Sequence, residues 1–277
     1  MCLLFYPMVG NYLNLIRQRE EIAGYREAVE AAGAAERARL WEEAERYNGR
    51  LRSLGAPLAE YEELGEAYRA ALDVDGTGIL GYVGIPGIGV ELPISHGTEE
   101  ETLKRGAGHL EGTSLPVGGE STHAVLSAHR GLPGAKLFTE LDRVKEGDLF
   151  TVTVLGRELV YEVDLICVVE PEEMEVLNVE EGKDYVTLMT CTPYGINSHR
   201  LLVRGKRAER EETAGKKAAQ DIPGMGALLP AYGVPVLFTV LFTILLFHRG
   251  KAGGRRKREG RSGDEKGRQC GQDPGGE

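Results

Sequence analysis

Residues 187–204 decide the fold, and they read TLMTCTPYGINSHRLLVR. An apolar run with β character ends at Cys191, a turn rich in Pro, Gly and Asn follows, and a second β-like run begins at Arg200. We therefore expect a hairpin that places one cysteine at a strand edge, facing an arginine. The thiolate is the reactive form of cysteine, and a fixed cation nearby favours it. Cys191 is thus predicted to be a nucleophile; the alternative is the buried, inert thiol that most free cysteines are.

A second stretch supplies a candidate partner for this cysteine. Residues 122–133 read THAVLSAHRGLP, a strand-like run that ends in His129 before a turn containing Gly and Pro. An imidazole can both donate and accept a proton near neutral pH, so we expect His129 to act as general acid and base. The remaining histidines are expected to be surface or packing residues: His96, His109, His123, His199 and His248.

The hairpin stretch resembles the Thr-Leu-x-Thr-Cys signature of sortases, and its extension to Arg200 is similar to class C, the pilin-polymerising branch of that family. The resemblance extends over residues 66–207. It implies a mainly β fold: a sortase-type closed β-barrel of about eight strands. The sequence on either side of the barrel adds N-terminal helices and a C-terminal transmembrane helix to the expected fold. Three further blocks carry the same resemblance: GAGHLEGTSLP at 106–116, the histidine stretch at 122–133, and LFTEL at 137–141.

The resemblance also implies a reaction. Cys191 would attack the carbonyl between Thr and Gly of a Leu-Pro-x-Thr-Gly-like sorting signal and form a thioacyl intermediate. Arg200 would stabilise the developing negative charge, and His129 would transfer the protons. A lysine of another pilin subunit would then resolve the intermediate into an isopeptide bond. Arg130 and Arg204 are the alternatives to Arg200, but Arg204 lies further along the strand from the turn.

Composition excludes several other classes of protein. The chain has 277 residues and a formal net charge of -10, which argues against a nucleic-acid partner. No spacing of His, Cys and Asp matches a metal site, and no cofactor is expected. The cysteines have no paired spacing, so neither a disulfide framework nor a zinc cluster is expected; they are Cys2, Cys167, Cys191 and Cys270.

Two apolar segments, at 1–16 and 225–247, predict the cellular compartment. Residues 225–247 contain no charged residue and are long enough to cross a bilayer. A basic tail follows, so we expect it to be cytoplasmic and the preceding domain to lie outside the cell membrane. The expected organisation is an apolar remnant of an N-terminal membrane segment (1–16), a helical N-terminal or lid region (17–74), the catalytic barrel (75–207), a linker (208–224), the transmembrane helix (225–247) and the tail (248–277).

The N-terminal region reads as helix. Residues 17–54 predict a long, solvated helix whose apolar stripe is too thin to build a core, and a second helix is expected at 60–72. In class C sortases the region between such helices carries a lid with an Asp-Pro-aromatic motif. Residues 53–60 contain neither the aspartate nor an aromatic residue, which predicts a groove open to nucleophiles.

The rest of the chain reads as short strands separated by Gly and Pro. The acidic run at 170–181 is expected to be a solvated loop with a helical turn, and in sortases this connection walls the substrate groove. We expect strands at 79–85, 90–94, 123–129, 148–155, 158–169, 185–190 and 200–203.

The sequence is compatible with more than one function. The expected partners are pilin subunits or other surface proteins with a C-terminal sorting signal, an acceptor lysine, and the membrane. A cell-wall-anchoring sortase would instead use an amine of a peptidoglycan precursor. A membrane-bound β-barrel that binds without catalysis is the alternative from another class. A papain-like protease fits poorly, because there the cysteine precedes the histidine in the chain.

Overall fold

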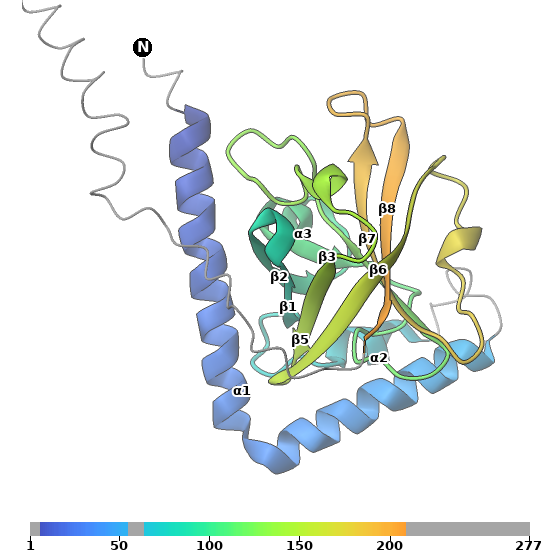
Figure 1. Ribbon diagram of the computed structural model, residues 1–277. Coiled ribbons are helices and arrows are strands. Elements are labelled where there is room, and N and C mark those ends of the chain that lie inside the picture. The colour runs from blue at the N-terminus through green and yellow to red at the C-terminus, as the bar shows by residue number, and fades with distance from the viewer. Residues whose placement is uncertain (1–5, 55–63, 209–277) are drawn as a thin grey trace, which may run out of the picture. The chain divides into compact units, whose positions relative to one another are not determined.

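The computed structural model describes residues 6–54 and 64–208, and its centre is a closed barrel with the strand order β1-β2-β3-β4-β7-β8-β6-β5 (Figure 1). Pairing of β1 with β5 closes the barrel. The strands are β1 (Ile79–Ile85), β2 (Val90–His96), β3 (Ala107–His109), β4 (Thr122–Ser127), β5 (Leu149–Val154), β6 (Arg157–Val169), β7 (Asp184–Thr192) and β8 (His199–Arg207).

Two parallel pairs interrupt an otherwise antiparallel barrel. Strand β3 runs parallel to β2, and β7 runs parallel to β4. Because β4 and β7 run in the same direction, their C-terminal ends meet at one edge of the barrel. The residues that follow β4 and the last residues of β7 are therefore neighbours, although they are far apart in sequence.

Side chains alternate between the two faces of the barrel wall, as strand geometry requires. Inward side chains such as Leu126, Leu188 and Val203 belong to the main core. Outward side chains of the same three strands, together with one residue of β6 and one of the short 3-10 helix η5 (Glu175–Leu177), form a smaller apolar cluster, which we call the outer patch: Val125, Val169, Leu177, Met189 and Leu202. Leu177 comes from η5, so the β6–β7 connection packs over this part of the wall.

Helix α1 (Tyr6–Ser53) is bent at Gly33, whose φ of 72° and ψ of 173° are not helical. Glycine adopts a positive φ without the steric cost that a side chain imposes. In Figure 1 the two arms of α1 run along different sides of the barrel. Both arms bury aromatic side chains in the main core, including Tyr25 and Tyr47. The expectation of a solvated helix with too little apolar surface for a core is therefore wrong.

Polar contacts also fix α1 to the barrel. The Tyr25 hydroxyl donates to the carbonyl of Leu80 and accepts from the amide of Leu155, both at 2.8 Å. The Asn48 side chain pairs with both backbone groups of Leu115, at 3.1 and 2.7 Å. Buried polar groups are costly unless they are satisfied, so these contacts hold α1 in one register.

The expected strands correspond to observed ones within a few residues, but β3 was not expected. The shorter helices are α2 (Gly65–Ala70) and α3 (Glu100–Arg105), with 3-10 turns η3 (Pro86–Ile88) and η4 (Leu141–Arg143). Among the described residues, no helix combines the length and apolar character needed to cross a membrane. Residues 6–16 of the expected N-terminal membrane segment are described and form the first turns of α1. The expected span at 225–247, the basic tail and most of residues 53–60 fall outside the described ranges.

Candidate active site

The β7–β8 hairpin pairs Cys191 directly with Arg200. Directly opposed residues on antiparallel strands have their Cβ atoms about 5 Å apart on the same face. That face is the outer one, because Met189 and Leu202, two residues from Cys191 and Arg200 respectively, both belong to the outer patch. The thiol and the guanidinium therefore emerge side by side, next to the outer patch, and Cys191 is half-buried.

His129 reaches the same edge from β4. Ser127 is in register with Met189, and the Ala128 amide donates to the Met189 carbonyl at 3.1 Å. The Thr190 hydroxyl donates to the Ala128 carbonyl at 2.8 Å, so the pairing continues beyond the end of β4. Ala128 faces the main core, which turns the next side chain outward. Continuing the register by two residues places His129 beside Cys191, on the same face.

The contacts of His129 reveal a residue that the sequence did not indicate. Nε2 of His129 lies 3.2 Å from a carboxylate oxygen of Glu100, near the start of α3. The side chain of His129 is 27% exposed and that of Glu100 is 61% exposed, so the pair is open to solvent. Lys104 lies on the other side of the carboxylate, with Nζ 3.6 Å from Glu100. No signal in the sequence linked a residue of a short acidic helix to the histidine.

The three candidate arginines differ in their partners. The Arg200 guanidinium donates to the backbone carbonyls of Asn197 and His199, at 3.4 and 3.3 Å. Among the described residues it has no carboxylate partner. These hydrogen bonds are long and go to neighbouring backbone groups. The guanidinium can therefore reorient toward a negative charge that develops at Cys191. The preference for Arg200 as the oxyanion donor thus has a structural reason.

Arg204 and Arg130 are both committed to carboxylates. Arg204 makes two bonds to Asp164, at 3.1 and 3.0 Å, and a third to Glu180 at 3.0 Å. Arg130 is 10% exposed and pairs with Asp142 at 2.5 Å. These ion pairs make both residues structural in this arrangement, because release of either guanidinium would leave a partly buried charge without its partner.

Several other titratable groups of the barrel have structural roles. His109 is completely buried; burial lowers its pKa to about 4, so it is neutral at pH 7. Burial likewise lowers the pKa of His123, whose Nε2 lies 2.7 Å from the Thr187 hydroxyl. The expectation that both are packing residues is confirmed. Burial raises the pKa of Cys167, which favours its neutral thiol form. Within the described ranges, no group of three or more His, Cys, Asp or Glu residues could hold a metal ion.

At one edge, the outer face of this closed barrel presents a cysteine, a histidine and an arginine that has no carboxylate partner among the described residues. This arrangement defines a cysteine enzyme built on a β-barrel. Comparison with known proteins agrees. The Sortase domain family matches residues 83–208. Sortase A of Streptococcus agalactiae serotype III (strain NEM316) is 33% identical over 117 residues, which cover 41% of this chain and 47% of the relative. The chain therefore spans about half the length of that relative.

Two solved structures are more similar. Sortase C1 from Streptococcus agalactiae is 43% identical with a TM-score of 0.67, and the match covers 69% of this chain and 100% of that one. Sortase C of Streptococcus pneumoniae, whose structure is reported with insights into catalysis and pilin substrate specificity, is 45% identical with a TM-score of 0.61, covering 69% and 97%. The chain belongs to the sortase family.

Proposed function

We propose that the protein is a class C sortase, a cysteine transpeptidase that joins pilin subunits. The observation that carries this proposal is the pairing of Cys191 with Arg200 across β7 and β8, with His129 two residues beyond the end of the neighbouring strand β4. The similarity to class C structures, one of which concerns pilin substrate specificity, supports the choice of substrate.

The first half-reaction forms the thioacyl enzyme. The sulfur of Cys191 bonds to the carbonyl carbon between Thr and Gly of the sorting signal, and Arg200 stabilises the negative charge on the carbonyl oxygen. The C–N bond then breaks, and protonated His129 gives its proton to the departing glycine amine.

The second half-reaction transfers the acyl group. A lysine amine attacks the thioester carbon, neutral His129 takes a proton from that amine, and the C–S bond breaks to restore the thiolate of Cys191. The product is an isopeptide bond between two subunits. Attack by water instead of the amine would release the free acid, so transfer requires a groove that positions the amine.

The proposal includes attachment to the cell membrane. The uncharged run at 225–247 and the basic residues that follow support a span with the catalytic domain outside the cell and the tail in the cytoplasm. Holding enzyme and membrane-bound substrates on one surface would raise their effective concentration. A reporter enzyme that works only in the cytoplasm should be active when it is fused after residue 277. Activity of a reporter that works only outside the cell would contradict this orientation.

A peptide assay tests the chemistry. A fluorogenic peptide containing Leu-Pro-x-Thr-Gly should be cleaved between Thr and Gly, and intact-protein mass spectrometry should detect the acyl enzyme. Cys191→Ala should abolish both signals, whereas Cys167→Ala should keep them. Cleavage that persists in Cys191→Ala would refute the proposal. Co-expression with a pilin should give a ladder of covalent multimers, while attachment to peptidoglycan fragments alone would favour the anchoring alternative.

A further inference from the structure

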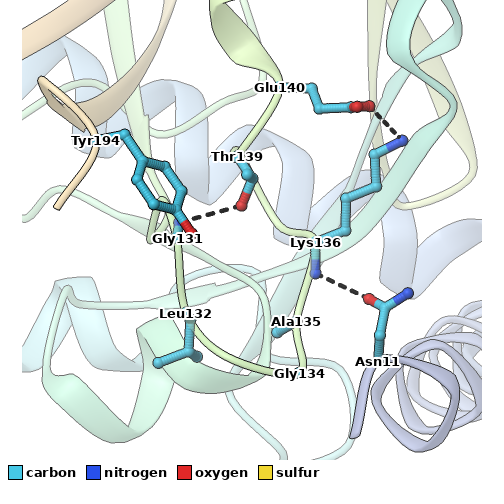
Figure 2. A pocket seen from close by; sticks show the side chains of 9 residues that line it. All are labelled: Asn11, Gly131, Leu132, Gly134, Ala135, Lys136, Thr139, Glu140 and Tyr194. Carbon is cyan, nitrogen blue, oxygen red and sulfur yellow. Dashed lines mark hydrogen bonds and ion pairs between the residues drawn. The ribbon is translucent and has the colours of Figure 1, made fainter. Parts of the chain in front are cut away.

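An open pocket of about 350 Å³ lies between α1, the segment after β4 and the β7–β8 connection (Figure 2). Its walls come from three parts of the chain: Asn11 on α1, the segment between β4 and η4, and Tyr194 on the β7–β8 connection. The volume is within the range of about 300–1,000 Å³ that small-ligand sites occupy. The reaction steps above make no use of this pocket.

The pocket is tied to the catalytic pair through two short connections. Gly131 follows His129 by two residues, and Tyr194 follows Cys191 by three. The Tyr194 ring packs over the Gly131 backbone: a Cβ atom added there would lie 2.7 Å from Cε2 of the ring. The Phe138 amide donates to the His129 carbonyl at 3.2 Å, which folds the pocket segment back onto the histidine. A ligand in the pocket is therefore close to the residues that would perform the chemistry.

The pocket wall is preformed, and its charges are neutralised. The Lys136 amide donates to the Asn11 side chain at 3.0 Å, and the Gly131 amide donates to the Thr139 hydroxyl at 3.1 Å. The Lys136 ammonium donates to the Ile88 carbonyl at 2.6 Å and pairs with Glu140 at 2.8 Å. Figure 2 shows the contacts of Lys136 with Asn11 and Glu140 on one side of the pocket, and the Gly131–Thr139 contact beside the Tyr194 ring.

The groups left for a ligand are mainly apolar or aromatic. Tyr194 is 61% exposed, and Leu132 lies beside it on the wall. The amide nitrogen of Asn11 has no partner within the described ranges and can donate to a peptide carbonyl. An aromatic face and an aliphatic side chain suit the methylene stem of a lysine, and the ring face also attracts its ammonium group before deprotonation.

We propose that this pocket holds the acceptor: a peptide segment that presents a primary amine to the thioester. The inference rests on the proposed transpeptidase function. Both substrates must lie near Cys191 together, because the acyl group stays on the sulfur while the amine attacks. The donor carbonyl must reach Cys191 and Arg200 on the barrel wall, which leaves the pocket at the strand ends for the acceptor. From there the amine nitrogen bonds to the acyl carbon, its proton passes to His129, and the bond to sulfur breaks.

The experiment measures how the acyl enzyme partitions between amine and water. The full-length chain is given a sorting-signal peptide, with or without a second peptide containing one lysine, and both products are quantified by mass spectrometry. Tyr194→Ala should raise the KM for the lysyl peptide at least about fivefold and leave hydrolysis of the donor peptide unchanged. Tyr194→Phe should keep transfer near wild type, because the ring supplies the surface. Asn11→Ala, on the opposite wall, should also raise this KM.

Ile196→Ala is the matched control, because Ile196 is 72% exposed on the same connection but does not line the pocket. It should leave both rates unchanged. Equal loss of transfer and hydrolysis in Tyr194→Ala, or no change in either, would overturn the acceptor assignment. A peptidoglycan stem peptide should compete poorly with the lysyl peptide; stronger binding of the stem peptide would overturn the choice of a protein acceptor. Failure of the wild type to form an acyl enzyme would instead refute the proposed function itself.

Discussion

Nε2 of His129 lies 3.2 Å from a carboxylate oxygen of Glu100, so the candidate acid–base residue is held by a residue from the short helix α3. When the Nε2 hydrogen donates to this carboxylate, Nδ1 is the nitrogen left to exchange protons with a substrate. An adjacent carboxylate also stabilises an imidazolium. The same logic applies to other nucleophile–histidine enzymes, in which a third group orients the base.

Glu100→Gln should lower kcat about two- to fivefold and leave the KM for the donor peptide unchanged. The modest size follows from solvent exposure, because exposed pairs are worth only about 0.2–1 kcal/mol. Glu100→Asp should restore part of the rate. Nitrogen chemical shifts of His129 should move toward the other tautomer in Glu100→Gln, a change that general loosening of α3 would not produce.

Glu101→Gln is the control for this prediction. Glu101 is the next residue of α3, is 87% exposed, and pairs with Lys104 at 3.1 Å. Its replacement should change neither kcat nor the His129 signals. If both variants lose the same activity, the effect comes from the charge of α3 and Glu100 does not position the imidazole.

Arg200→Ala should reduce kcat for donor cleavage by about 10²- to 10³-fold, the usual effect of removing one oxyanion donor. Arg200 is available for this task because, within the described part of the chain, its side chain bonds only the backbone carbonyls of Asn197 and His199. Arg204→Ala provides the contrast: it removes the pairs with Asp164 and Glu180 and should lower the melting temperature more than kcat. Steady-state kinetics and thermal unfolding of both variants would decide, and a larger kcat loss in Arg204→Ala would reverse the assignment.

Much of the barrel was predictable because its strands are bounded by Gly and Pro and alternate in polarity. Strand β3 was not, because Ala107–His109 is too short to show a pattern and is defined by its pairing with β2 and β4. The burial of α1 was misjudged for a different reason. Few positions face the core, but Tyr25, Trp41 and Tyr47 are large, and an aromatic residue buries more area than an aliphatic one.

The candidate trio was predictable from local sequence and resemblance. The structure pairs Cys191 with Arg200, and His129 lies two residues beyond the end of β4, the strand beside β7. Their catalytic roles stay predictions. Glu100 and the pocket around Tyr194 could not be found this way, because each depends on contacts between segments far apart in sequence. The Asn11 contact with Lys136, for example, joins the first turns of α1 to the segment after His129.

The two described cysteines should differ in reactivity. Alkylation requires the anionic sulfur. Burial raises the pKa of Cys167, which favours its neutral thiol, whereas Cys191 lies at the open end of the β7–β8 hairpin, opposite Arg200 in the strand register. At pH 7, iodoacetamide should modify Cys191 at least about ten times faster than Cys167. Peptide mapping by mass spectrometry follows each cysteine separately, and loss of activity should track Cys191 alone. Faster labelling of Cys167, or inactivation that follows Cys167, would contradict this prediction.

Stability should fall as the pH drops from about 6.5 to about 4, because His109 is buried in its neutral form. Burial lowers its folded-state pKa to about 4, whereas an unfolded histidine titrates near about 6.5. Between these values the unfolded chain binds a proton that the folded chain does not, so protonation favours unfolding. Burial shifts the pKa values of His96 and His123 in the same direction. Above about 6.5 both states are neutral, and these histidines add no pH dependence.

Urea unfolding at pH 7, 6 and 5 measures the effect. Each such histidine can contribute up to about 1.4 kcal/mol of lost unfolding free energy per pH unit inside its window. His109→Gln should be less stable at pH 7, because it loses contacts with Tyr68 and the Ser114 carbonyl, but its stability should depend less on pH. The change in unfolding free energy per pH unit is therefore the quantity to compare between the variant and the wild type. A variant with the wild-type slope would show that His109 is not the group that titrates, and a wild type whose stability rises toward pH 5 would contradict the burial of neutral histidines altogether.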